Sequence, residues 1–346
     1  MIIISENITA DIATFLPKNE DEPIFILTDT NTENYCLPLI NKHERLSKAH
    51  VISIPSGDEN KNLNSLTEVW HYLSENGATR HSLMINLGGG MITDMGGFAA
   101  ATFKRGMDFI NVPTTLLGAI DAATGGKTGI NYLGFKNEIG VFAPAKAVLI
   151  NSDFFHTLDI QNVLSGFAEM VKHALISDKQ LIVETLRFDF DHLDYNELLR
   201  LTKINLDIKS KIVDEDPNEN GIRKALNFGH TFGHAFETLS YHTHNTLLHG
   251  YAVIWGLVCE SYLSHTKLGF PQQTVINLLY FAKENYGAFP FSCKQYNALF
   301  ELMKHDKKNE ANEMNFTLLS EIGNVHINQK ATKEEIFETL DWLQSM

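Results

Sequence analysis

The stretch SLMINLGGGMITD, at residues 82–94, decides the fold of this chain. An apolar run that ends at Leu87 is followed by Gly88, Gly89 and Gly90 and then by a helical segment carrying Asp94. Adjacent glycines let a backbone approach a pyrophosphate, and the following helix N-terminus offers unpaired N–H groups and the positive end of its dipole. Because the spacing differs from GxGxxG, the stretch alone predicts either a nucleotide-binding turn or a tight strand-to-helix turn.

Strands and helices alternate around this stretch. Short apolar runs predict strands at residues 24–28, 51–55, 82–87, 109–113 and 147–150, and an amphipathic pattern predicts a helix at 63–73. Nearly continuous apolar strands alternating with helices are typical of a parallel sheet covered on both faces. We therefore predict a Rossmann-like, doubly wound α/β domain at residues 1–158.

The second half has a different periodicity. Apolar residues recur with the helical period at 163–176, 195–213, 223–239, 250–265 and 272–286, and a single strand is predicted near 315–320. These segments predict a mainly α-helical domain at residues 159–346. In two-domain enzymes the substrate usually binds between the domains, so we expect the active site in the interdomain cleft.

Charge and cysteine content exclude several classes of protein. The chain has 28 Lys and Arg against 42 Asp and Glu, a net charge of −14, which disfavours nucleic acid or an anionic membrane as partner. Three distant cysteines, Cys36, Cys259 and Cys293, form no disulfide pattern, and no signal peptide is apparent. The longest uncharged run, 238–259, holds several His and Asn residues that would be costly in lipid. We expect a cytoplasmic protein without a membrane span.

A stripe of polar residues marks the segment 223–239. The spacings between Arg223, Asn227, His230 and His234 are four, three and four, so on one helix all four lie within roughly 60° of one another. The opposite side of that helix is apolar, so the stripe must face a cleft or water. Because the stripe combines two imidazoles, an amide and a guanidinium, a functional site is favoured over a solvated face.

Histidines and one glutamate suggest a metal site. Two neutral imidazoles and a carboxylate are the usual protein ligands of a catalytic divalent metal. The candidate imidazoles are His230, His234 and His249, and the candidate carboxylate is Glu169, which lies in an otherwise apolar helical turn. Two further histidines of this region are assigned to a loop: His242 and His244.

Basic residues beside glycines suggest an anionic substrate. The motifs KRG at 104–106, GGKT at 125–128 and KN at 136–137 combine cationic side chains with accessible backbone N–H groups, which together bind phosphate or carboxylate oxygens. The segment TDTN at 28–31 offers ribose-binding candidates, although capping of the next helix is the favoured interpretation.

Taken in order, these motifs resemble one family over nearly the whole chain. They are GGGMITD at 88–94, RG at 105–106, VPTTLL at 112–117, Asp121, GGKT, KN, GFAE at 166–169 with Lys172, GIRKALNFGHTFGH at 221–234, HG at 249–250 and DKK at 306–308. The chain resembles the 3-dehydroquinate synthases of the sugar-phosphate cyclase superfamily. The resemblance implies conversion of the phosphorylated keto acid DAHP to 3-dehydroquinate and phosphate, the second step of the shikimate pathway, with NAD as cofactor.

The resemblance also implies a role for individual residues. A divalent metal, zinc or cobalt, would be held by Glu169, His230 and His249. NAD would contact Asp29, Asn31, Asp58, Lys61, Gly89, Gly90, Asp94, Thr114, Thr115, Lys127, Lys136, Phe154, Thr157 and Leu158. Catalytic roles fall to Lys127, Asn137, Lys172, Arg223, Asn227 and His234. The substrate would further contact Arg105, Asp121, Lys136, Lys209, Lys307 and Lys308, with Arg105 reaching the phosphate bound by a neighbouring subunit, which implies a homodimer.

Three other functions compete with this interpretation. A metal-dependent NAD dehydrogenase of small polyols would share the two-domain build, but it would not require Lys127, Lys136 and Asn137. A cyclase of an uncarboxylated sugar phosphate is disfavoured by Arg223 and Lys209, because a guanidinium pairs with a carboxylate at two points. A nucleotide-binding regulatory or scaffolding protein would leave the polar stripe without a catalytic role.

Overall fold

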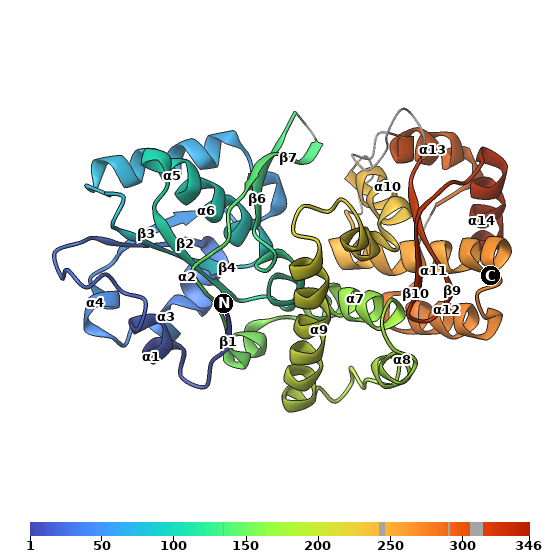
Figure 1. The fold of residues 1–346 in the computed structure, drawn as a ribbon, viewed down its shortest axis with the longest axis horizontal. Helices are drawn as coiled ribbons and strands as arrows, with labels where there is room; N and C mark the ends of the chain where they lie inside the picture. The colour runs from blue at the N-terminus through green and yellow to red at the C-terminus, as the bar shows by residue number, and fades with distance from the viewer. Residues whose placement is uncertain (134, 242–245, 290, 305–313) are drawn as a thin grey trace. The chain divides into compact units, whose positions relative to one another are not determined.

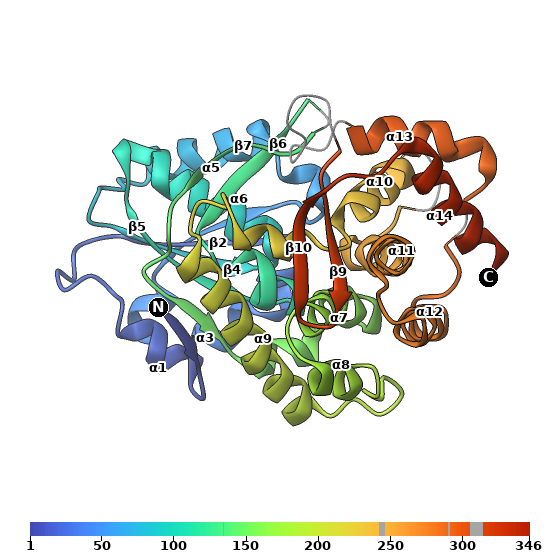
Figure 2. The ribbon, with the colours of Figure 1, turned by 45° about the vertical axis from the view of Figure 1, so that its right-hand side comes forward.

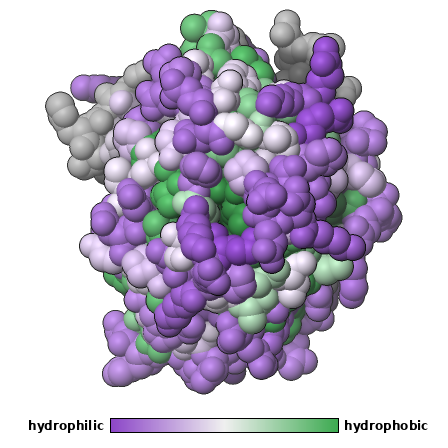
Figure 3. All heavy atoms as spheres, turned by 90° about the vertical axis from the view of Figure 1, so that its left-hand side faces the viewer, coloured by the Kyte–Doolittle hydropathy of each residue, from purple (hydrophilic) through white to green (hydrophobic). Residues whose placement is uncertain are grey.

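The computed structural model describes residues 1–133, 135–241, 246–289, 291–304 and 314–346. The chain divides into two compact units, Met1–Asp159 and Ile160–Met346, one residue beyond the boundary placed from the sequence. Across the described ranges, no helix combines the length and the apolar character needed to cross a bilayer. The face seen in Figure 3 is mostly hydrophilic, with some hydrophobic side chains gathered near its centre.

The first unit is built on a six-stranded sheet with the order β1-β8-β5-β4-β2-β3, whose strand pairs are all parallel. This confirms the predicted doubly wound α/β fold. Its strands and helices are β1 (Ile2–Ile4), α1 (Ile8–Ala13), β2 (Ile24–Asp29), α2 (Thr30–Tyr35), α3 (Leu37–Ile40), α4 (Glu44–Ser47), β3 (His50–Ile54), α5 (Leu63–Glu75), β4 (Leu83–Gly88), α6 (Gly90–Thr102), β5 (Asp108–Pro113), β6 (Lys127–Tyr132), β7 (Phe135–Phe142) and β8 (Val148–Ile150). Short turns of helix are η1 (Asp58–Asn60), η2 (Phe103–Arg105), η3 (Gly118–Ala122) and η4 (Ser152–Thr157).

Both faces of the sheet are covered, which explains why its strands are apolar almost throughout. Side chains alternate along β2, so Phe25 and Leu27 join a core with α5 and α6, while Ile24 and Ile26 join a second core with α1, α3 and α4. Figure 1 shows these two groups of helices on opposite sides of the sheet. A strand buried on both faces has no polar side, as expected for a parallel sheet.

The order of the strands places a ligand-binding edge between β2 and β4. The chain passes from β2 outward to β3, returns to β4 on the other side of β2, and continues to β5. The strand order therefore reverses between β2 and β4, and ligands of open α/β sheets bind at the carboxyl ends of the strands at such a point. Asp29 ends β2 and Gly88 ends β4.

A β-hairpin of the first unit was not predicted from the sequence. Strands β6 and β7 pair with each other in an antiparallel sheet, and they carry the motifs that sequence analysis described only as basic and glycine-rich. Gly129 and Gly140 are paired across the hairpin, and a Cβ added to Gly140 would lie 2.1 Å from the Thr128 carbonyl oxygen. These glycines interrupt the alternation of side chains from which a strand is predicted.

The second unit is mainly helical, as predicted. Its elements are α7 (Ile160–Leu175), α8 (Lys179–Thr185), α9 (Tyr195–Glu215), η5 (Ile222–Asn227), α10 (His230–Tyr241), α11 (His249–Leu268), α12 (Gln272–Tyr286), η6 (Cys293–Gln295), α13 (Tyr296–Lys304), β9 (Phe316–Glu321), β10 (Asn324–Gln329) and α14 (Lys333–Ser345). Helix α11 contacts α7, α10, α12, α14 and β9, and Figure 2 shows it surrounded by other elements. The predicted strand near 315–320 is β9, and its partner β10 was missed.

The single helix predicted at residues 223–239 is wrong. A short 3₁₀ turn, η5, ends at Asn227, and α10 begins only at His230. Between them Gly229 has φ +81°, a left-handed conformation that breaks the helix. Arg223 and Asn227 therefore do not share a helix face with His230 and His234, and the helix-wheel argument that grouped them fails.

We predict that Gly229→Ala destabilises the protein more than Gly269→Ala. Both glycines have similar φ values, +81° and +75°, so both variants incur about 1–2 kcal/mol for a left-handed alanine. At Gly229 the new Cβ would also lie 2.5 Å from Leu257 Cδ2, whereas at Gly269 it would meet nothing within 4 Å. Overpacking should add about 1–3 kcal/mol at Gly229 only.

Chemical denaturation of the two alanine variants, each compared with the unchanged protein, measures this difference. Equal losses of unfolding free energy would contradict the steric account of Gly229.

Candidate functional site

Three helices of the second unit bring Glu169, His230 and His249 together. Glu169 lies within α7, while His230 and His249 are the first residues of α10 and α11. Glu169 Oε1 lies 3.3 Å from His230 Nε2 and 3.2 Å from His249 Nε2. All three candidate ligand atoms lie within 4.8 Å of one another, and no other such group occurs in the part of the chain that the structure describes. We call these residues the triad.

The second nitrogen of each triad imidazole has its own partner. His230 Nδ1 lies 3.1 Å from the Phe228 carbonyl oxygen, and His249 Nδ1 lies 3.3 Å from Glu237 Oε2. Both partners are acceptors, so each Nδ1 carries the proton and donates it. This arrangement turns each Nε2 toward Glu169 Oε1, where it can bind a metal once it has lost its own proton. Sequence analysis missed Glu237.

Glycines allow the three helices to come close enough for the triad to form. A Cβ on Gly250, directly after His249, would lie 1.9 Å from the Ser165 carbonyl oxygen of α7. A Cβ on Gly256 would lie 1.9 Å from the carbonyl oxygen of Gly229, directly before His230. Helix α11 therefore touches the backbone of α7 and of the segment that begins α10, and the position of each triad residue follows from these two contacts.

A buried carboxylate also fixes the start of α10. The Glu260 side chain, fully buried on α11, accepts hydrogen bonds from the backbone N–H groups of Gly229 at 2.6 Å and Thr231 at 2.9 Å, with a longer one of 3.3 Å from Phe232. These groups lack partners inside the helix, and a negative charge is favourable at a helix N-terminus. Sequence analysis missed Glu260, although an acid in an apolar helix is the same signal that identified Glu169.

Charges around the triad oppose the effect of burial. Burial alone would raise the pKa of Glu169, but the Lys172 ammonium, ion-paired with its carboxylate, and the neighbouring His230 hold that pKa well below its usual range. Burial would lower the pKa of His249, but Glu237 and Glu169 raise it to about 10. The triad thus has an ionised carboxylate, which is the form that binds a metal.

Four other predicted residues of the second unit lie on α10, η5 and α9, each at least partly buried. The His234 ring lies 5.2 Å from that of His230 and 6.1 Å from that of His249, measured between centroids. Arg223 is buried in η5 and donates to the Pro217 carbonyl oxygen at 2.6 Å. Asn227 Nδ2 donates to Glu219 Oε1 at 2.8 Å, and Lys209 is buried in α9.

Five predicted residues of the first unit form one polar network. Lys61 is buried, forms an ion pair with Asp94, and donates to Asn137 Oδ1 at 2.5 Å. Lys136 Nζ lies 3.1 Å from Asp58 Oδ2. Burial opposes ionisation of Asp58, but Lys136 and Lys61 lower its pKa, whereas burial raises the pKa of Asp94 in spite of Lys61. The network joins the segment after β3, helix α6 and the hairpin.

The glycine turn after β4 is tightly packed. Gly89 precedes α6 as its N-cap, and a Cβ there would lie 3.1 Å from Thr115 Cγ2. The Thr114 N–H donates to the Gly88 carbonyl oxygen at 3.0 Å, so the ends of β4 and β5 are joined. The glycines thus let the segment after β5 pack against this turn, and they leave the backbone N–H groups at the N-terminus of α6, which can bind a phosphate, without side chains of their own.

At the end of β2 the capping interpretation is confirmed. Asp29 Oδ1 accepts hydrogen bonds from the backbone N–H groups of Asn31 at 2.8 Å and Thr32 at 3.0 Å. Farther along the chain, Thr157 Oγ1 donates to the carbonyl oxygen of the buried Phe154 at 2.7 Å, and Leu158 follows η4.

The remaining predicted residues are dispersed. Arg105 has φ +67° and lines a cavity of about 570 Å³ with Arg80 and His81. Asp121 lies in η3, and Lys127 is exposed at the start of β6. Four residues named in the sequence analysis lie outside the described residues: His242, His244, Lys307 and Lys308.

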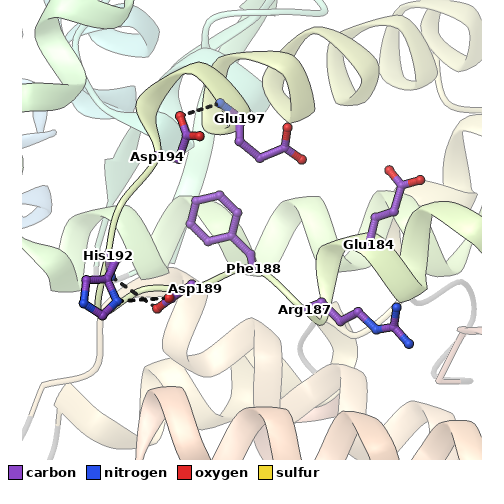
Figure 4. A pocket seen from close by; sticks show the side chains of 7 residues that line it. All are labelled: Glu184, Arg187, Phe188, Asp189, His192, Asp194 and Glu197. Atoms are coloured by element: carbon purple, nitrogen blue, oxygen red, sulfur yellow. Dashed lines mark hydrogen bonds and ion pairs between the residues drawn. The ribbon is translucent and has the colours of Figure 1, made fainter.

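A separate hollow, in the second unit, is lined by none of the predicted residues. It has a volume of about 370 Å³ and lies between α8 and α9, as Figure 4 shows. Its lining is Glu184, Arg187, Phe188, Asp189, His192, Asp194 and Glu197. Asp189 and Asp194 accept hydrogen bonds from nearby backbone N–H groups, so these carboxylates serve the local turns.

We predict that Glu237→Gln weakens zinc binding by about 10- to 100-fold, because the amide no longer holds His249 with the charge of a carboxylate. Competitive titration of the metal-free protein against a chromogenic chelator measures the affinity. Glu184→Gln, at a partly exposed glutamate of α8 that lines this hollow, is the matched control and should leave zinc affinity unchanged. Equal affinities of the two variants would contradict a role of Glu237 at the triad.

Comparisons with known proteins agree with this geometry. A family model described as the 3-dehydroquinate synthase N-terminal domain matches residues 51–165, and the model of the C-terminal domain matches residues 166–309. A 3-dehydroquinate synthase from Parabacteroides distasonis is 50% identical over 341 residues, which cover 99% of this chain and 97% of that protein.

Two solved structures share the fold at 22% sequence identity. One is a 2-epi-5-epi-valiolone synthase from Streptomyces hygroscopicus with NAD⁺ and Zn²⁺ bound, at a TM-score of 0.86 over 100% of this chain and 96% of that one. The other is a 2-deoxy-scyllo-inosose synthase complexed with carbaglucose-6-phosphate, NAD⁺ and Co²⁺, at a TM-score of 0.84 over 98% and 95%. The family models span most of the chain, and it belongs to the 3-dehydroquinate synthase family.

Proposed function

We propose that this chain converts DAHP to 3-dehydroquinate and phosphate, through transient oxidation by NAD, loss of phosphate, re-reduction, ring opening and intramolecular aldol closure. The observation that carries the proposal is the triad: a buried carboxylate and two oriented imidazoles in a chain of this family. In this reading residues 1–158 bind NAD, and residues 159–346 bind the metal and much of the substrate.

The donor set of the triad fits zinc or cobalt. Two imidazole nitrogens and one carboxylate oxygen leave a coordination position open for a substrate oxygen. When bound, the metal would acidify a coordinated hydroxyl and stabilise the negative charge that develops on it. Lys172 keeps Glu169 ionised, and Glu237 holds the His249 ring in place. His234, whose ring lies beside both triad imidazoles, would orient the substrate.

The first unit supplies the groups for NAD. The N-terminus of α6, free of side chains at Gly89 and Gly90, suits the pyrophosphate. Asp29 and Asp58 would accept hydrogen bonds from ribose hydroxyls, and Asp94, held by Lys61, would lie toward the nicotinamide. NAD itself would accept a hydride from the substrate and return it, so it is not consumed. Contacts at Asn31, Thr114, Thr115, Phe154, Thr157 and Leu158 complete this proposal.

The cationic residues suit a substrate that carries a carboxylate and a phosphate. In a chain of net charge −14, an anion must find local positive charge. The proposed contacts are Arg105, Asp121, Lys127, Lys136, Asn137, Lys172, Lys209, Arg223 and Asn227, with Lys307 and Lys308 retained from the sequence alone. Arg223 is assigned to the carboxylate, which its planar guanidinium can bind at two points.

The assembly and the compartment belong to the same proposal. Arg105 is exposed at the rim of a cavity with Arg80 and His81, which supports its predicted reach to the phosphate in a second subunit of a homodimer. The three cysteines are all free, which supports the cytoplasm as the compartment.

We expect the purified protein to release phosphate from DAHP with catalytic NAD, without accumulation of NADH at 340 nm. A chelator should abolish the release, and added zinc or cobalt should restore it, because the triad requires its metal. A net formation of NADH from glycerol-like alcohols, with no phosphate release, would instead identify a polyol dehydrogenase.

We expect Arg223→Lys to raise the KM for DAHP by roughly 10-fold or more, because an ammonium cannot replace a two-point contact with a carboxylate. Steady-state kinetics at saturating NAD measure the change. Lys224→Arg, at the adjacent and partly exposed residue, is the control and should leave KM unchanged. An unchanged KM in Arg223→Lys would remove the carboxylate assignment.

A further inference from the structure

The pairing of strands β6 and β7 is irregular around Asn131. Ile130 pairs with Ile139 and Tyr132 pairs with Phe135, so a single residue of β6 lies opposite three residues of β7. Those three residues are Lys136, Asn137 and Glu138. Such a bulge re-aims the side chains of the longer strand and is common beside active sites. Two of the re-aimed residues, Lys136 and Asn137, belong to the proposed site.

The Asn131 side chain joins this bulge to the segment after β3. Its Oδ1 accepts a hydrogen bond from the Asn137 backbone N–H at 2.9 Å. Its Nδ2 donates to the backbone oxygen and to Oδ2 of Asp58, each at 3.1 Å. The Asn131 backbone N–H donates to the Lys61 carbonyl oxygen at 2.8 Å. The amide therefore uses its acceptor and its donors between two segments that are far apart in sequence.

These contacts determine where three other side chains lie. Asn137 has φ +50°, and the bond from its N–H to Asn131 supports that left-handed conformation. In this conformation Asn137 Oδ1 meets Lys61 Nζ at 2.5 Å, and Lys136 Nζ lies 3.1 Å from Asp58 Oδ2. Besides the Asn131 amide, the contacts described here between the hairpin and the segment carrying Asp58 run through the Asn131 backbone N–H and through long, flexible lysine side chains.

We propose that Asn131 is a positioning residue for the reaction: it sets the place of Asp58 for NAD and of Lys136 and Asn137 for the substrate. This inference rests on the proposed function and deepens it. Asn131 touches neither substrate nor cofactor in this account, and it acts through the residues that do. A misplacement of about 1 Å in such residues lowers the rate on the order of 100-fold.

Two substitutions separate the effect of the Oδ1 acceptor, which bonds to Asn137, from that of the Nδ2 donor, which bonds to Asp58. Asn131→Ala removes both, so we expect the Kd for NAD to rise about 10-fold and kcat/KM for DAHP to fall roughly 10- to 100-fold. Asn131→Asp is isosteric and keeps the acceptor for the Asn137 N–H, but it loses the donor and faces the Asp58 carboxylate. It should weaken NAD binding as much as Asn131→Ala and lower kcat/KM for DAHP, at saturating NAD, by much less.

The measurements are calorimetric titration with NAD, steady-state kinetics on the metal-loaded protein, and thermal unfolding of each variant. Tyr132→Ala is the matched control, because strand alternation directs this exposed neighbour to the other face of β6. It should leave NAD affinity and kcat/KM within twofold of the unchanged protein.

Several outcomes would overturn the inference. Parallel losses in Asn131→Ala and Tyr132→Ala would indicate a general need for an intact hairpin, and unchanged NAD affinity in both Asn131 variants would exclude positioning of Asp58. Loss of the folded state in both would assign Asn131 to stability alone. If the unchanged protein binds NAD but releases no phosphate from DAHP, the proposed function fails. The NAD affinities of the Asn131 variants would then still test whether Asn131 positions Asp58.

Discussion

The close contact of α11 with α7 and with the start of α10 is the constraint on which the second unit depends. Gly250 and Gly256 have no room for a side chain, since an added Cβ would lie 1.9 Å from a backbone oxygen in each case. Because His249 and His230 are adjacent in sequence to these contact points, the packing of the backbone itself sets the positions of the metal-binding candidates.

Buried carboxylates complete that arrangement. Glu169, Glu237 and Glu260 are all buried, and isolated charges in such places would be strongly unfavourable. Glu169 faces Lys172 and two imidazoles, Glu237 faces His249, and Glu260 accepts backbone N–H groups. Each carboxylate therefore has a partner that compensates its charge, and each carboxylate also holds that partner in place. The contacts that make the buried charges tolerable are thus the ones that position the triad.

In the first unit, charged groups are compensated by a network that joins separate segments of the chain. Asp58, Lys61, Asp94 and Asn137 come from a loop, a helix and a hairpin, and their charges and amides pair with one another. Sequence analysis named Asp94 and Asn137 from their motifs and Asp58 and Lys61 through the resemblance, but it did not name Asn131, whose bonds depend on a bulge. A bulge arises from the register between two strands, and local patterns do not encode register when glycines interrupt the alternation.

The sequence by itself determined the fold class, the glycine turn before α6 and the residue types of the triad, because apolar periodicity and motif spacing are local properties. It did not determine that the segment 223–239 breaks at Gly229, where the backbone is left-handed and Leu257 of another helix leaves no room for a side chain. It also did not reveal Glu237 or Glu260. The partner of Glu237 is His249 on another helix, and the partners of Glu260 are backbone N–H groups that become available only where α10 begins. Tertiary structure decided these points, because burial and the pairing of charges depend on which elements finally touch.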